Sequence, residues 1–198
     1  MSAPVLRDYQ AKSVAEIRAA FSAGMRRVLL VAPCGSGKTV LFSYIAAGAA
    51  RKGKRVVILC HRQELLQQIS DSLAQFGVRH AILAGGTRGT PRAQVVVASV
   101  FTLARRLQHF QRPHLIVADE AHHCVTKTTW GRVAAYFRES LVLGVTATPV
   151  RLDGAGLGDV FHQMILGPST AELTERGYLS PAEVYAPPVQ LVLKGIHT

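Results

Sequence analysis

A glycine-rich segment that ends in a Lys–Thr pair carries the clearest chemical signal in this sequence of 198 residues. It follows an apolar run and reads Ala32-Pro33-Cys34-Gly35-Ser36-Gly37-Lys38-Thr39. The two glycines let successive backbone N–H groups point at phosphate oxygens, and a helix beginning at the end of the segment adds its dipole. Lys38 would place positive charge on the β- and γ-phosphates, and the Thr39 hydroxyl would ligate Mg²⁺. We therefore expect a phosphate-binding loop, although the usual first glycine is here Ala32.

An acidic pair, Asp119-Glu120, follows a second apolar run. A carboxylate at a strand end can hold the Mg²⁺ that Thr39 also contacts, and the adjacent Glu120 can deprotonate an attacking water. Such a pair alone is more often a solvated loop, but about 80 residues after a phosphate loop it predicts nucleotide hydrolysis. The neighbouring His122-His123-Cys124 has no second ligand pair at metal spacing, since Cys60-His61 are merely adjacent, so we expect magnesium and not zinc.

The charge is unevenly distributed along the chain. The net charge is +11 with a pI near 10.2. Residues 1–112 carry a net charge of +13, whereas residues 113–198 carry −2. This asymmetry favours a polyanionic partner such as nucleic acid, bound by one face of the molecule. An arginine-rich codon usage would give the same excess without any partner.

The overall composition is that of a folded, non-exported chain. Apolar residues make up 48% and charged residues 18%, which excludes a disordered chain. No stretch approaches the roughly 20 apolar residues of a membrane-spanning helix. Residues 1–8 show no apolar signal core behind a basic start, so we expect no export, and the three widely spaced cysteines suggest no disulfide framework. We expect a cytoplasmic location.

Short apolar runs alternate with amphipathic segments, which is typical of an α/β fold. The expected strands are 28–32, 56–60, 95–98, 115–118 and 141–145, with 81–84 as a weaker candidate; the expected helices are 8–22, 62–76 and 100–110. The runs show no in/out alternation, so we expect a mainly parallel, doubly wound sheet with helices on both faces. Ligands of such sheets bind at the carboxyl ends of the strands, where both chemical signals lie.

The last thirty residues follow a different pattern. Ser169 to Glu172 is a capping-box pattern, and Gly177 is a suitable end for the short helix that it starts. Pro181, Pro187 and Pro188 then punctuate two extended pieces, the second at residues 189–193. We expect a domain boundary here.

Four motifs together resemble motifs Q, I, II and III of superfamily 2 helicases. They are Leu6-Arg7-Asp8-Tyr9-Gln10, the phosphate loop, Asp119-Glu120-Ala121-His122 and Val145-Thr146-Ala147-Thr148-Pro149. The stretch Arg151-Leu152-Asp153-Gly154 makes the chain most similar to the DEAH-containing, restriction-subunit-like branch. The resemblance spans residues 5–186 and implies a RecA-like domain.

The resemblance also implies roles for single residues. Arg7 and Gln10 match positions that contact adenine, and His122, Thr146 and Thr148 match the group that couples nucleotide state to nucleic-acid binding. Residues 60–65, 85–86 and 98–102 resemble the loops that, in this family, hold the backbone of one nucleic-acid strand. The resemblance therefore implies that Arg62, Gly86, Ser99 and Thr102 contact nucleic acid. The alternative for Arg62, Arg105 and Arg106 is solvated surface charge.

The resemblance places a first RecA-like domain at residues 1–186 and the start of a linker at 187–198. A second RecA-like domain would then lie outside the chain, and the chain alone would be weakly active or inactive. We expect the motor domain of an ATP-dependent DNA helicase or translocase, using ATP and Mg²⁺ on single-stranded or duplex DNA. A nucleotide-dependent binding module without motor activity remains the alternative. The Arg7–Gln10 and Thr146–Thr148 matches disfavour a phosphate-loop kinase or switch.

Overall fold

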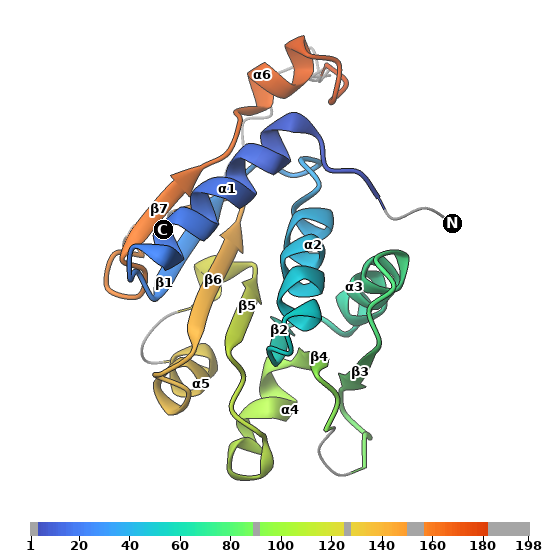
Figure 1. Cartoon of the computed structure of the whole chain (residues 1–198), viewed down its shortest axis with the longest axis vertical. Helices are drawn as coiled ribbons and strands as arrows, with labels where there is room; N and C mark the ends of the chain where they lie inside the picture. Colours follow the sequence, from blue (N-terminus) through green and yellow to red (C-terminus); the bar gives the residue numbers. More distant parts are fainter. Residues whose placement is uncertain (1–3, 89–91, 125–127, 150–156, 182–198) are drawn as a thin grey trace, which may run out of the picture.

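The computed structural model describes residues 4–88, 92–124, 128–149 and 157–181. Within these residues the fold is a seven-stranded sheet in the order β3-β4-β2-β5-β6-β1-β7, with every neighbouring pair parallel (Figure 1). The strands are β1 (Arg27–Val31), β2 (Val56–Cys60), β3 (His80–Leu83), β4 (Val95–Ser99), β5 (Leu115–Asp119), β6 (Leu141–Thr146) and β7 (Gln163–Leu166). The expected parallel α/β sheet is confirmed.

Helices cover both faces of this sheet. They are α1 (Asp8–Ser22), α2 (Lys38–Arg51), α3 (Gln63–Gln75), α4 (Val100–Ala104), α5 (Thr129–Tyr136) and α6 (Thr170–Glu175), with 3-10 turns at Leu107–His109 and Ala121–His123. Within the described ranges, no helix combines the length and apolar character required to cross a bilayer.

The core consists of two apolar layers, one on each side of the sheet. Alternate strand residues face opposite sides, so Val56 and Ile58 pack with α1, α2 and α3, whereas Val57 and Leu59 pack with α4 and α5. Because both faces are covered, β2, β4 and β5 are buried at every position. This explains why their sequences show no alternation of polar and apolar residues.

Two helices and six strands agree with the sequence prediction to within two residues, but the expected helix at 100–110 is wrong in extent. The α-helix ends at Ala104, and the chain turns with the Arg106 N–H donating to the Leu103 carbonyl oxygen before the short 3-10 turn. Leu103, Leu107 and Phe110 are nevertheless all buried. The apolar spacing therefore identifies the buried residues of this segment correctly while overestimating its regularity.

Strand β7 and helix α5 were not expected. In β7 only Ile165 is buried, and the strand pairs with β1 at the sheet edge. An edge strand with one buried side chain has too weak an apolar pattern to be recognised. Helix α5 is short, and Trp130 and Val133 are its only buried residues.

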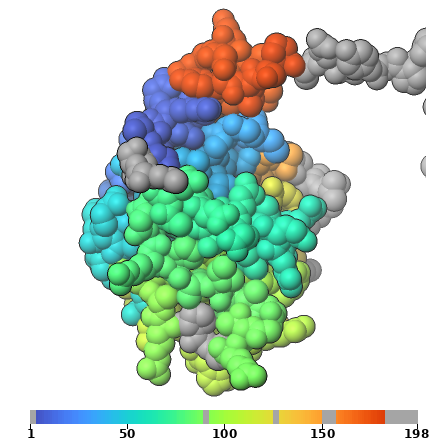
Figure 2. Space-filling view, turned by 90° about the vertical axis from the view of Figure 1, so that its right-hand side faces the viewer, coloured from blue at the N-terminus to red at the C-terminus, as the bar shows by residue number. Residues whose placement is uncertain are grey.

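Helix α6 begins with the expected capping box. The Ser169 side chain accepts a hydrogen bond from the Glu172 N–H, and the Glu172 carboxylate accepts one from the Ser169 N–H. Gly177 has a φ of 70° just beyond the helix end, as its role there requires. The helix projects above the body of the molecule, next to the start of α1 (Figure 2). The stretches 151–154 and 187–198, with the extended piece at 189–193, lie outside the described residues.

Candidate nucleotide and nucleic-acid site

The phosphate loop connects β1 to α2, as the sequence predicts. Gly35 and Gly37 have φ values of 79° and 76°, a left-handed conformation that favours glycine. The Lys38 ammonium donates hydrogen bonds to the carbonyl oxygens of Ala32 (3.1 Å) and Pro33 (3.0 Å). Lys38 thus lies folded over the loop, within the concavity where phosphate oxygens would lie. Thr39 follows in the first turn of α2 and is half-buried.

Gln10, one of the two predicted adenine residues, contacts the phosphate loop itself. The Gln10 amide nitrogen donates to the carbonyl oxygens of Ser36 (3.1 Å) and Gly37 (3.3 Å), and its amide oxygen accepts from the Arg7 N–H (2.9 Å). Tyr9, which sequence reasoning assigned no role, donates its hydroxyl proton to the Ser36 carbonyl (3.0 Å). The start of α1 therefore fixes the shape of the loop by contacts with its backbone.

The segment after α6 packs on the same region. The Tyr178 ring meets Tyr9 edge-on at 5.3 Å, and the Arg7 guanidinium lies 4.6 Å from the Tyr178 ring centroid. Arg176 forms an ion pair with Asp8 at the first turn of α1. A Cβ on Gly35 would lie 2.6 Å from the Leu179 side chain, so this leucine packs directly on the phosphate loop. Nothing in the local sequence indicated these contacts, because they join residues about 140 to 170 positions apart.

The acidic pair lies at the end of β5. Asp119 is the last residue of the strand and is 9% exposed. Burial, and next the charge of Glu120, raise the pKa of Asp119 to about 6, while Lys38 acts in the opposite direction. Glu120 has a left-handed backbone (φ 55°, ψ 52°), which turns the chain sharply into the 3-10 turn Ala121–His123.

A series of polar contacts joins the acidic pair to β6. His122 Nδ1 lies 3.1 Å from Thr146 Oγ1 and 3.3 Å from the Glu120 carboxylate. The Thr146 hydroxyl in turn donates to the Thr148 carbonyl oxygen (3.0 Å) and accepts from the Thr148 N–H (3.2 Å). A carboxylate only accepts hydrogen bonds, so a proton on Nδ1 would let His122 donate towards Glu120, and the same tautomer decides which of His122 and Thr146 donates to the other. The structure thus brings together the three residues that the resemblance assigns to coupling.

Two further histidines, His61 and His123, lie beside these contacts, and nothing in the sequence indicated that their rings meet. The His61 ring, after β2, meets the His123 ring at 4.8 Å, and His123 meets His122 at 4.1 Å. Burial is the main cause that lowers the pKa of both His61 and His123. The stack connects the loop after β2 with the acidic pair after β5.

The candidate strand-binding residues, which are those expected to contact a nucleic-acid strand, lie at the ends of the other three β-strands, β2, β3 and β4. Arg62 is exposed and precedes α3, Gly86 is exposed after β3 with a φ of 85°, and Ser99 ends β4 opposite Cys60. Ser99 is buried and Thr102 is half-buried in α4. Arg62 and Gly86 are therefore the more accessible of the four.

The strand order divides this edge of the sheet into two halves. The ends of β5, β6 and β1 hold the acidic pair, the Thr146 hydrogen bonds and the phosphate loop, while the ends of β3, β4 and β2 hold the candidate strand-binding residues. The histidine stack lies where the halves meet.

The donors near the phosphate loop suit a hard cation shared with a nucleotide. Among the described residues there is no cluster of three or more His, Cys, Asp or Glu able to hold a metal. Mg²⁺ is commonly held by one or two protein oxygens together with phosphates and water. Asp119 and Thr39 offer such oxygens, and a cation would relieve the electrostatic cost that raises the Asp119 pKa. The residues present therefore fit Mg²⁺.

A parallel sheet with a phosphate loop after β1 and an acidic pair after β5 defines a RecA-like P-loop domain. Residues 3–151 match the family described as Type III restriction enzyme, res subunit. The chain belongs to this family, whose members are helicase-like ATPases.

Three similar proteins illustrate the relationship. A 51.5 kDa protein of a Lactococcus phage is 34% identical over 160 residues, covering 81% of this chain and 32% of its own. A Saccharomyces cerevisiae protein named as a candidate ATP-dependent helicase, IRC3, is 30% identical over 200 residues, covering 92% of this chain and 29% of its own. The Type ISP restriction-modification enzyme LlaGI, solved with a DNA substrate mimic, superimposes with a TM-score of 0.70 at 17% identity, covering 88% of this chain and 21% of its own. This chain spans between a quarter and a third of the length of the curated relatives it matches.

Proposed function

We propose that this chain is the ATP-binding domain of an ATP-dependent DNA helicase or translocase that hydrolyses ATP with Mg²⁺. The main support for this proposal is the arrangement of residues along one edge of the sheet. The candidate nucleotide-binding residues occupy one half of this edge, and the candidate strand-binding residues occupy the adjoining half. The structural neighbour LlaGI, solved in complex with a DNA substrate mimic, supports DNA as the partner.

The residues of this chain would divide the work of hydrolysis as follows. The phosphate loop and Lys38 bind the β- and γ-phosphates, and Lys38 must first leave the carbonyl oxygens of Ala32 and Pro33. Asp119 and Thr39 would hold Mg²⁺, which neutralises charge on the phosphate oxygens. Glu120 accepts the proton of the attacking water. Its contact with His122, at 3.3 Å, gives Thr146 and Thr148 a route by which they respond to the state of the nucleotide.

The loops after β2, β3 and β4 would contact the backbone of a DNA strand. Arg62, Gly86, Ser99 and Thr102 offer a guanidinium group, N–H groups and hydroxyls, which bind phosphates without reading the bases. The His61–His123 contact would connect this half to the catalytic half. A second RecA-like domain would supply the arginine that approaches the γ-phosphate, a contribution of about 10³–10⁵ in rate. We therefore expect slow hydrolysis by residues 1–198 alone.

Substitution of Lys38 tests the phosphate-loop assignment directly. Lys38→Ala should weaken ATP affinity about tenfold or more, because it removes a charge-assisted contact to phosphate. Isothermal titration calorimetry with ATP and Mg²⁺ measures this, and circular dichroism verifies the fold. Lys52→Ala is the matched control, since it removes the same charge just beyond the opposite end of α2. Equal ATP affinity of folded Lys38→Ala and the parent would exclude the assignment.

ATP hydrolysis and DNA binding by a protein in which a second RecA-like domain accompanies this one separate the motor from the alternative. A motor should show ATP hydrolysis that single-stranded DNA accelerates. Nucleotide-dependent DNA binding without accelerated hydrolysis would instead identify a binding module.

A further inference from the structure

Much of the basic excess of residues 1–112 lies away from the candidate site. Several of its cations flank the amino ends of the strands, at the opposite edge of the sheet from the phosphate loop: Arg26, Arg27, Arg51, Lys52, Lys54, Arg55 and Arg112. Arg62 is the single cation among the four residues proposed to contact DNA. The DNA contacts proposed above therefore do not account for the charge at this far edge.

A groove of about 670 Å³ opens at this far edge. It lies between the last turns of α1 and α2 and the first residues of β5 and β6. Aliphatic and aromatic side chains contribute a large part of its lining: Phe21, Ile45, Ala49, Leu115 and Leu141. The volume lies within the range of pockets that enclose a compact ligand, roughly 300–1,000 Å³. The groove can therefore accept several side chains and not merely an ion.

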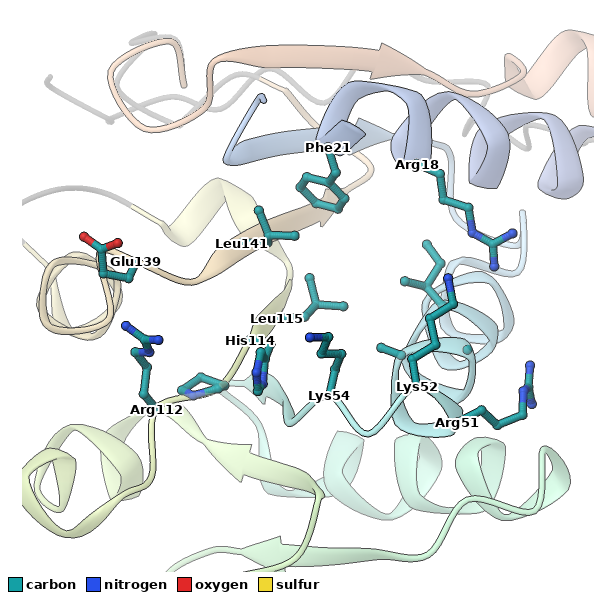
Figure 3. Close-up of a pocket in the computed structure, with 14 residues that line it drawn as sticks. Arg18, Phe21, Arg51, Lys52, Lys54, Arg112, His114, Leu115, Glu139 and Leu141 are labelled. Atoms are coloured by element: carbon teal, nitrogen blue, oxygen red, sulfur yellow. The ribbon is translucent and has the colours of Figure 1, made fainter. Parts of the chain in front are cut away.

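Cations lie at both ends of the groove and between them. Figure 3 shows Arg18, Arg51 and Lys52 towards one end and Arg112 at the other, with Lys54 between them. Glu139 is the single carboxylate among the lining residues. Within the described part of the chain, none of the five cations takes part in an ion pair. Their charge is thus available to an anionic ligand.

His114, in the middle of the groove, experiences the positive potential of the surrounding cations. Its pKa is lowered by partial burial and by the charges of Lys54, Arg55 and Arg112. His114 Nδ1 accepts a hydrogen bond from the Arg55 N–H (3.0 Å), which also requires the unprotonated ring nitrogen. An elongated anion lying across the groove would relieve this mutual repulsion of cations.

The combination of charge and apolar surface distinguishes between the possible ligands. Single-stranded nucleic acid gains affinity from bases stacked on aromatic rings, and the lining has two such rings, Phe21 and His114, against four aliphatic side chains, Ile45, Ala49, Leu115 and Leu141. The aliphatic side chains of the lining instead suit apolar side chains of a ligand, and the cations of the groove suit carboxylates. We propose that this groove is a docking site for an acidic peptide segment of a partner protein that also carries apolar side chains. The site is independent of the proposed ATPase activity.

A labelled peptide measures this binding. The probe is a fluorescein-labelled peptide of about 12 residues in which Glu alternates with Leu, titrated with residues 1–198 and followed by fluorescence anisotropy. Peptides in which Gln replaces Glu, or Ser replaces Leu, should each bind about tenfold more weakly, because each lacks one of the two matching features. Binding should weaken at high salt.

Three variants locate the binding. Lys54→Glu should weaken affinity about tenfold, whereas Arg79→Glu changes net charge equally at an exposed position outside the groove and should have less than about a twofold effect. Gly48→Leu narrows the groove without changing charge and should also weaken affinity about tenfold. A Cβ at Gly48 meets only the end of the Arg18 side chain at 3.5 Å, so this variant should fold, as circular dichroism would verify.

Three outcomes would overturn the proposal. Binding that is insensitive to Gly48→Leu would indicate diffuse attraction to a basic surface. Tighter binding of single-stranded DNA of matched length, weakened by Lys54→Glu and Gly48→Leu, would make the groove a nucleic-acid site. A loss of peptide affinity in Arg79→Glu equal to that in Lys54→Glu would show that the groove is not the binding site. Lys38→Ala should leave peptide binding unchanged, so failure of the ATP assignment and failure of this proposal are separate results.

Discussion

Glu120 is the one non-glycine residue with a positive φ in the described part of the chain. Such a conformation costs of order 1–3 kcal/mol and persists where the surroundings hold it. The preceding residue, Asp119, is fixed by β5, and the following Ala121 is fully buried. The unusual backbone at Glu120 is therefore held by both of its neighbours, and it directs the carboxylate towards His122.

Glu120→Gln should preserve ATP binding and lower hydrolysis about 10²–10⁴-fold, because the amide keeps the shape but cannot accept a proton. The measurement is steady-state hydrolysis in a longer, active version of the protein, with ATP affinity measured in parallel. Glu139→Gln, the same change at the far edge of the sheet, is the control and should keep the parent rate. Hydrolysis by Glu120→Gln at the parent rate would assign the base elsewhere.

The protonation of Asp119 couples the candidate site to the stability of the folded protein. Its pKa in the folded protein is about 6, above the ordinary value of 3.8, so the folded state keeps this proton at a pH where the unfolded chain has lost it. The contribution of Asp119 to stability is therefore fully present below about pH 4, falls as pH rises towards 6, and stays low above that. Asp119→Asn should stabilise the fold by up to about 3 kcal/mol at pH 7.5, with little gain near pH 4.

Urea unfolding in metal-free buffer at several pH values tests this expectation. Asp71→Asn, at an exposed carboxylate on α3, is the matched control and should show no comparable gain. A gain for Asp119→Asn that is the same at pH 4 and pH 7.5 would contradict a raised pKa as its cause.

At the scale of elements, α6 is fastened to α1 by few contacts. Its buried residue is Leu173, and its contacts with α1 include Tyr178 on Tyr9 and the Arg176–Asp8 ion pair. Tyr178→Ala should therefore raise amide exchange rates across Thr170–Glu175, because it removes an aromatic contact of about 0.5–1.5 kcal/mol. Hydrogen exchange with mass spectrometry measures the change. Tyr178→Phe keeps the ring and should retain most of the protection; equal exchange in the parent and Tyr178→Ala would show that the ring does not hold α6.

Elements with strong apolar patterns could be predicted from the sequence, and weakly patterned ones could not. The buried strands of the centre show continuous apolar runs because helices cover both of their faces. Strand β7 lacked this pattern because three of its four residues are exposed. The premature end of α4 could not be foreseen, since Leu107 and Phe110 continue the apolar spacing although the chain leaves the helix.

At the scale of the whole molecule, the sequence predicted which residues lie at the strand ends but not which strand ends are neighbours. The hydrogen bond of His122 with Thr146 depends on β6 lying next to β5. The contacts of Tyr178, Leu179 and His61 depend on tertiary packing between distant segments. Net charge alone could not place the cations, and many of them lie at the edge opposite the phosphate loop.

Binding of single-stranded DNA should depend steeply on salt, because the proposed contacts are to phosphates. Arg62→Ala should weaken affinity for different sequences by similar factors and reduce the slope of log affinity against log salt by about one. Fluorescence anisotropy with a short labelled strand measures the slope. Arg79→Ala, an exposed arginine at the opposite edge, is the control and should leave the slope nearly unchanged. A flat plot for the parent chain would rule out phosphate contacts as the source of affinity.

The three cysteines differ in accessibility in a way that bears on the phosphate loop. Cys60 and Cys124 are buried, and burial raises the pKa of each thiol to about 12, whereas Cys34 is exposed within the loop. Alkylating reagents react with accessible thiolates, so a maleimide would modify Cys34 before the other two. The adduct would lie beside Gly35, where bound phosphate would have to fit. Cys34 is thus a chemical probe of the candidate nucleotide site, because bound ATP would shield it and the alkylation rate would report how much of the loop is occupied.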